Sequence, residues 1–142
     1  MSMRNAACAI ALLSLAGAFA ESDSRPFKGS ANWGFVGEVP PNVGLVSMIS
    51  GRSSHMGELD GTGKVFFTPL PKDATLTLVA ANGDEVQLAA HGEPDSSGAF
   101  VGSYRITGGS GRFAGAVGSG DWTAVANADG TVTTNWNGII GY

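Results

Sequence analysis

The sequence of 142 residues has few of the side chains that most often carry chemistry or cross-links. It contains one cysteine, Cys8, and two histidines, His55 and His91. Beyond Cys8 the chain therefore has no disulfide, no thiol nucleophile and no thiolate metal site. The two histidines are far apart and neither has a second ligand at a metal-binding spacing. We accordingly expect neither a metal site nor a cofactor.

Charged residues are also scarce, at 14% of the chain, and the formal net charge is −4. No stretch is basic enough to suggest phosphate binding, so we expect no nucleic-acid partner. The Gly-Gly-Ser-Gly run at 108–111 is not a phosphate loop, because no Lys-Ser/Thr follows it and no helix is expected after it. No serine lies in a Gly-x-Ser-x-Gly turn, so hydrolase chemistry has no support.

The first twenty residues have the pattern of an export signal. Arg4 is the only charged residue before Glu21, residues 6–16 are apolar, and Ala18-Phe19-Ala20 is a small-x-small cleavage site. The apolar run is shorter than the roughly 20 residues of a transmembrane helix. We expect a signal peptide at 1–20, a single domain at 21–142, and a secreted or periplasmic protein without a membrane anchor.

After this signal the sequence is typical of strands and turns, with no clear helical period. Runs rich in Val, Thr and aromatic residues alternate with Gly, Asn, Asp and Pro, which favours an all-β barrel or sandwich. Pro40-Pro41 interrupts any strand near that point. The expected strands cover residues 28–37, 43–57, 59–68, 74–80, 84–92, 98–107, 116–126 and 131–141.

Loop length determines which residues share a face in the hairpin around Asn82-Gly83. A two-residue loop would place Leu78 on the same face as Gln87 and Glu85. A three-residue loop at 81–83 instead gathers all the large apolar residues on one face, and burial favours this register. Gly83 would then be the left-handed residue of a bulged turn.

A second hairpin resolves in the same way. A three-residue loop at 128–130 pairs Asn127 with Thr131 and sets Trp122 opposite Trp136. Both hairpins thus have one apolar and one polar face. An apolar sheet face must be covered, so the sheet is expected to close on itself or to pack on a second sheet.

Glycines in two other segments support closure into a small barrel. In the run 55–67, the residues expected to face inward are His55, Gly57, Leu59, Gly61, Gly63, Val65 and Phe67, and those from Met56 to Phe66 with the other parity are expected to face water. Glycines on the inner face allow a strand to coil tightly. The segment 108–120, GGSGRFAGAVGSG, is expected to turn a corner and insert Phe113 as a plug at one barrel end.

Several of these runs resemble those of a known family. His55-Met56-Gly57, GTGKVFFTP, residues 80–84 and above all SYRITGGSGRFAGAVGSG are similar to the bacterial secreted proteins of the allene oxide cyclase-like, or dirigent-like, barrels. The resemblance spans roughly residues 28–141 and implies one calycin-like antiparallel barrel of about eight strands. The catalytic residues of plant cyclases and the paired aspartates of dirigent proteins find no match, so no role is transferred.

Two residues are candidates for chemistry. His55, if it faces an apolar interior, could act as a general base or orient a carbonyl group. Alternatively, it is held by a backbone group near a barrel end or shapes the turn before Gly57. Tyr104, on the same face as Phe100 and Ile106, could donate to a substrate oxygen. Alternatively, it packs in the core and forms a hydrogen bond at the rim.

Aromatic residues on the expected inner face could bind a ligand or simply fill the core. They are Trp33, Phe100, Trp122 and Trp136. Three hypotheses for function stay open. The protein could be a barrel that confines a small apolar molecule, as a cofactor-free cyclase or isomerase would, or a module that binds such a molecule without turnover. It could also be a structural envelope protein that self-associates as a homo-oligomer. His91 is expected to be a surface residue.

Overall fold

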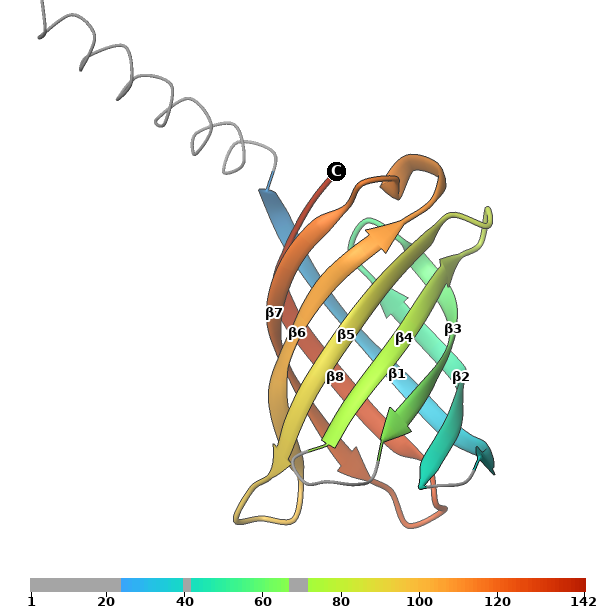
Figure 1. Cartoon of the computed structure of the whole chain (residues 1–142), viewed down its shortest axis with the longest axis vertical. Coiled ribbons are helices and arrows are strands. Elements are labelled where there is room, and N and C mark those ends of the chain that lie inside the picture. Colours follow the sequence, from blue (N-terminus) through green and yellow to red (C-terminus); the bar gives the residue numbers. More distant parts are fainter. Residues whose placement is uncertain (1–23, 40–41, 67–71) are drawn as a thin grey trace, which may run out of the picture.

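Eight antiparallel strands, each paired with its neighbours in the sequence, close into a barrel when β1 pairs with β8 (Figure 1). The computed structural model describes residues 24–39, 42–66 and 72–142. The elements are β1 (Ser24–Val39), β2 (Val43–Ser53), β3 (Gly57–Phe66), β4 (Lys72–Ala80), β5 (Glu85–Pro94), β6 (Phe100–Gly109), the 3-10 turn η1 (Gly111–Phe113), β7 (Val117–Ala126) and β8 (Val132–Gly141). The expected fold class, an all-β antiparallel barrel, is confirmed.

Each expected strand matches an observed one, with differences at its ends. β1 is longer than expected, because its pairings are offset: residues 24–33 pair with β8 and residues 29–39 pair with β2. It carries irregularities at Asn32/Trp33 and Phe35/Gly37. The expected signal peptide at 1–20 lies outside the described residues, as does Phe67. No helix among the described residues is long and apolar enough to cross a membrane.

Both predicted hairpin registers are confirmed. The backbone N–H of Ala80 donates to the carbonyl of Asp84 at 2.9 Å, and that of Asn127 donates to the carbonyl of Thr131 at 2.8 Å. Gly83 has the left-handed φ of 92° that its loop requires. In consequence Trp122 and Trp136 are cross-strand partners, as expected.

The glycine-rich segment closes one end of the barrel, again as expected. It forms η1 between β6 and β7, and Phe113 at the end of η1 is fully buried. Phe27, Val86 and Ile140 are also fully buried and belong to the same core cluster. This end of the barrel therefore has a packed apolar core.

The inward and outward pattern predicted for 55–67 is correct for the described residues from Glu58 onward and wrong at residues 55–57. Leu59 and Gly61 are buried inside, whereas Met56, expected to face water, is only 5% exposed and packs in the core. The reason is local: β2 ends at Ser53, residues 54–56 form a turn, and His55 has a left-handed φ of 68°. Alternation of faces holds only in extended backbone.

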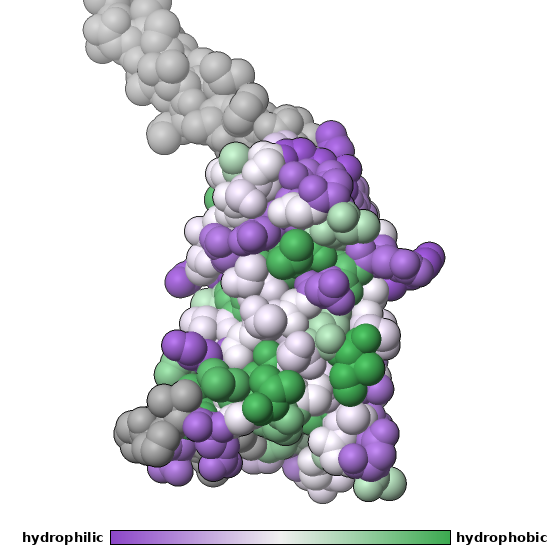
Figure 2. All heavy atoms as spheres, turned by 90° about the vertical axis from the view of Figure 1, so that its right-hand side faces the viewer, coloured by the Kyte–Doolittle hydropathy of each residue, from purple (hydrophilic) through white to green (hydrophobic). Residues whose placement is uncertain are grey.

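The outer surface mixes polar and apolar side chains more than the hairpin faces suggested. Figure 2 shows apolar groups interspersed with polar ones on one side of the barrel. The most exposed large apolar residues are Val36, at 67%, Val117, at 64%, and Ile49, at 61%. The core is therefore apolar, but the outer face of the barrel is not uniformly polar.

Two loops are stabilised by their own aspartates, which predicts a defined acid response. Oδ1 of Asp129 accepts hydrogen bonds from the hydroxyl and the N–H of Thr131, at 2.6 and 3.0 Å. Ser97 makes the equivalent bonds to Asp95. These bonds, with the side-chain bond the largest cause, hold the pKa of each aspartate below its ordinary value of 3.8.

Because the pKa values of Asp95 and Asp129 are lower in the folded state, their contribution is complete above pH 3.8 and is lost as the pH falls through the folded pKa. Urea denaturation below pH 3.8 should therefore show a smaller loss of stability with falling pH for Asp129→Asn, which keeps an acceptor oxygen but does not titrate. Asp60→Asn serves as a surface control, and an equal change in both variants would contradict this role.

Candidate functional site

A cavity of about 820 Å³ occupies the barrel toward the end where β1 meets β2 and β7 meets β8. Its walls include residues near those strand ends, such as Phe35, Ala126 and Val132. The four aromatic residues predicted to contact a ligand, Trp33, Phe100, Trp122 and Trp136, all line it, and Tyr104 lines it as well. The parity arguments from the sequence therefore placed Phe100, Tyr104, Trp122 and Trp136 on the correct face.

The remaining cavity wall is mostly aliphatic. It is contributed largely by β2 to β5, through Val46, Val65, Leu76, Leu78 and Leu88. Glu38 and Asp73 are also among the lining residues, although the carboxylate of Asp73 pairs with the exposed His91. None of the described lining residues is a lysine, arginine or histidine, and no group of three metal-ligating side chains occurs among the residues that the structure describes.

One row of inner residues explains how large indoles fit in so small a barrel. Across β1, β8, β7, β6 and β5 the paired residues are Gly29, Trp136, Trp122, Gly102 and Gly92. The ring of Trp136 occupies the space that a side chain at Gly29 would fill, and the ring of Trp122 does the same at Gly92. The indoles therefore extend sideways over glycines of other strands.

In the next row the glycines lie on β7 and β8, and the large rings lie on the strands beside them. Here Gly138 and Gly120 are paired across β8 and β7, with Phe27 and Tyr104 on either side of them. The rings of Phe27 and Tyr104 meet edge to face, with centroids 6.5 Å apart. The Tyr104 hydroxyl lies over both glycines, where a side chain on either would touch it.

The indole nitrogens of Trp122 and Trp136 differ in their hydrogen bonding. Nε1 of Trp122 donates to the carbonyl oxygen of Ser103 at 2.9 Å. Nε1 of Trp136 and Oη of Tyr104 are buried and have no hydrogen-bond partner among the described residues. A buried polar group without a partner costs on the order of 1–3 kcal/mol.

Burial, and to a smaller extent the nearby charge of Asp121, raises the pKa of Tyr104 to about 12. The phenol is thus neutral at physiological pH and can act as a hydrogen-bond donor or acceptor. It can reach a molecule in the cavity only by rotating away from Gly120 and Gly138, because the hydroxyl oxygen is covered in this structure.

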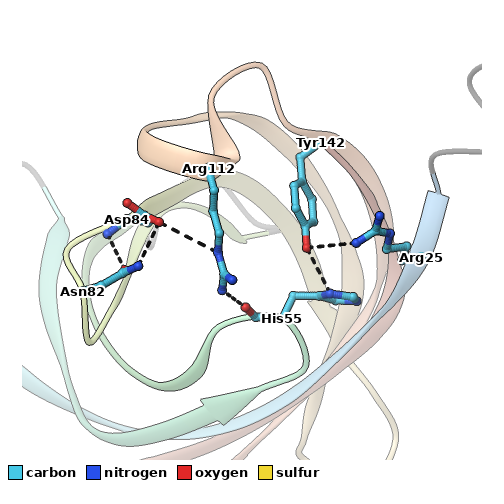
Figure 3. Close-up of polar contacts among 6 residues, drawn as sticks. All are labelled: Arg25, His55, Asn82, Asp84, Arg112 and Tyr142. Carbon is cyan, nitrogen blue, oxygen red and sulfur yellow. Dashed lines mark hydrogen bonds and ion pairs between the residues drawn. The ribbon is translucent and has the colours of Figure 1, made fainter.

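His55 does not face the cavity, and the predicted inner location is wrong. It lies in the turn between β2 and β3 at the closed end, shown in Figure 3. Nε2 lies 2.9 Å from the carbonyl oxygen of Pro26 and must carry the proton, so Nδ1 accepts from the hydroxyl of Tyr142 at 3.2 Å. The alternative, a histidine held by a backbone group near a barrel end, describes the observed contacts.

Arg112 of η1 ties this closed end together. Its guanidinium donates to the carbonyl oxygen of His55 and lies 3.8 Å from the carboxylate of Asp84 in the β4–β5 loop (Figure 3). The ring of Tyr142 packs edge-on against Phe113, with centroids 4.9 Å apart. The structure therefore separates the two residues singled out for chemistry, because Tyr104 lines the cavity and His55 belongs to the opposite closure.

Sequence reasoning missed the residues that position the aromatic wall. Gly29 and Gly92 lie in expected strands, but their contact with the indoles depends on registers that were not resolved from the sequence. No loop joins β1 to β8, and the β5–β6 register is set by a three-residue loop at 96–98 of the same type as the two predicted ones. His91, expected on the surface, is exposed, and its Nδ1 lies 2.5 Å from a carboxylate oxygen of Asp73.

Comparison with solved structures supports the barrel type. No family model and no curated protein matches this sequence. The structure of the pterocarpan synthase dirigent protein GePTS1 matches with a TM-score of 0.53 and 16% identity, covering 84% of each chain. That of the pterocarpan synthase dirigent protein PsPTS1 matches with a TM-score of 0.55 and 14% identity, covering 84% of this chain and 94% of the other. At these identities the likeness establishes the fold, a dirigent-like barrel, as the sequence resemblance implied.

The unpartnered hydroxyl of Tyr104 leads to a stability prediction. Tyr104→Phe should leave the ligand-free protein at least as stable at pH 7, because no hydrogen bond is lost. In the wild type the raised pKa gives stability that is complete below the ordinary pKa of 10.0 and is lost as the pH rises toward 12. The variant should lack this alkaline loss in urea denaturation. A loss above about 1 kcal/mol at pH 7 would reveal a hydrogen-bond partner instead.

Proposed function

We propose that the protein is exported and holds a small apolar or aromatic molecule inside its barrel. The observation that carries the proposal is the cavity of about 820 Å³ with aromatic and aliphatic walls. Ligand pockets typically measure about 300–1,000 Å³ and are lined mainly by apolar side chains with few polar groups. Burying about 200 Å² of apolar ligand surface contributes roughly 5 kcal/mol before the costs of association.

The same wall argues against an anionic ligand. A carboxylate buried among the described lining residues would find no cationic partner, and an unpaired buried charge is strongly unfavourable. Export is supported by the sequence alone, through the apolar stretch at 6–16 and the cleavage site before Glu21.

A cofactor-free isomerase or cyclase is the second candidate, favoured by the unpartnered hydroxyl of Tyr104. A closed apolar cavity can lower a barrier by holding a flexible substrate in one reactive conformer. Tyr104 would donate a hydrogen bond to a substrate oxygen after rotating toward the cavity. His55 has no part in this proposal, because its ring is engaged by Pro26 and Tyr142 at the closed end.

Filling the cavity tests the proposal. Ala124 lines the cavity and is 8% exposed, whereas its neighbour Val125 faces outward and is 52% exposed. Binding of the neutral fluorophore N-phenyl-1-naphthylamine should weaken at least tenfold in Ala124→Phe, because the new ring occupies ligand space. Val125→Phe and His55→Ala should bind like the wild type. Absence of binding in the wild type, or equal binding by Ala124→Phe and Val125→Phe, would overturn the proposal.

Export gives a separate prediction. Expressed with its full sequence, the protein should be recovered outside the cytoplasm with Glu21 as its first residue, as N-terminal sequencing would show. Deleting residues 2–20 should retain it in the cytoplasm with the fold unchanged. Recovery of the full-length chain with Met1 in place would contradict export.

A further inference from the structure

We propose that the cross-strand pair of Trp122 and Trp136 is a preformed stacking surface that makes the cavity select flat, uncharged ring systems over puckered ones. The inference rests on the proposed binding function and names the class of ligand. Both indoles lie on the inner face of a closed barrel, line the cavity and are partly exposed. Trp33, by contrast, is only 6% exposed and contributes mainly to the core.

Trp122 is held in place by two contacts that do not involve a ligand. Its Nε1 donates to the carbonyl oxygen of Ser103, and its six-membered ring lies across the space above Gly92. A hydrogen bond at one edge and backbone beneath the ring fix both side-chain torsions. The indole therefore loses little rotamer entropy when a ligand binds.

Trp136 is held by packing instead of a hydrogen bond. Its ring fills the space above Gly29 on the adjacent strand and packs against Phe27, with centroids 6.1 Å apart and planes at 45°. Any side chain at Gly29 would displace the ring, because the three atoms nearest to its Cβ position all belong to Trp136. Gly29 is thus a positioning residue that acts through Trp136.

Two indoles in fixed positions should bind flat ligands more tightly than puckered ones. Aromatic pairs gain more than their buried area accounts for, and a saturated ring of similar size loses that gain while burying comparable apolar surface. We expect the pair to favour a flat ligand about fivefold to tenfold. An anionic ligand is disfavoured, because the described lining has no basic side chain to pair with it.

Two alcohols with one carbon skeleton, 2-naphthol and decahydro-2-naphthol, isolate this effect in titration calorimetry. The saturated alcohol is at least as apolar, so hydrophobic transfer alone predicts no preference for the flat one. The wild type should bind 2-naphthol at least fivefold tighter. Trp122→Leu and Trp136→Leu should each bring the ratio toward one, mainly by weakening 2-naphthol.

Gly29→Ala should lower the same ratio by tilting Trp136, and it should change nothing further in a Trp136→Leu background. Gly34→Ala is the matched control on β1, because its new methyl group would meet only Ile49 at ordinary contact distance, 3.4 Å. The two tryptophan variants decide the question where Gly29→Ala does not fold.

Equal affinities of the wild type for the two alcohols would overturn the stacking surface and leave the proposed binding function intact. A ratio that persists in both tryptophan variants would also overturn it, because the selectivity would then come from elsewhere in the cavity. If neither alcohol binds and N-phenyl-1-naphthylamine does not bind either, both proposals fail.

Discussion

The barrel depends on the absence of side chains where its strands approach one another most closely. At Gly102, Gly118, Gly120 and Gly138, an added Cβ would overlap a carbonyl oxygen of the neighbouring strand. Glycine at these inner positions lets β5 to β8 coil tightly enough to close. The space left above the glycines is then filled from the side, by indole and phenol rings of adjacent strands. The same glycines thus allow the backbone to curve and leave room for the aromatic rings, in rows where glycines and large rings lie on neighbouring strands.

The two ends of the barrel differ because their loops use their polar groups differently. At the closed end, Arg112 binds the turn at His55 and the loop at Asp84, which draws η1 over the core above Phe113. At the cavity end, Asp95 and Asp129 satisfy the N–H groups of their own tight loops. The β4–β5 loop at the closed end also satisfies its own N–H group, since Oδ1 of Asn82 accepts from the N–H of Asp84, so the bridge made by Arg112 is what distinguishes that end. The cavity lies toward the end that carries the Asp95 and Asp129 loops, away from η1.

Local loop chemistry made much of this fold predictable from the sequence. The three-residue loops after Ala80 and Asn127 fix the faces of four strands, and these include Trp122 and Trp136. Phe113 could be placed because one large apolar residue stands among glycines. His55 could not be placed, because its left-handed backbone breaks the alternation on which the argument depended. The glycine beneath the Trp136 indole could not be predicted either, because Gly29 contacts Trp136 only when the first and last strands pair.

The polar atoms without partners are best understood from where they lie. A barrel optimised only for packing would place phenylalanine at Tyr104 and avoid an indole N–H at Trp136, because each unpaired polar atom is destabilising when buried. At the closed end, in contrast, the polar side chains of His55, Arg112 and Tyr142 all have partners. Local rules of stability are most often broken at functional sites. Three buried side-chain atoms among the described residues lack a partner, and two of them, on Tyr104 and Trp136, belong to the cavity wall, whereas the third, Oδ1 of Asn32, does not. Most of this energetic cost therefore falls in the same part of the barrel as the cavity.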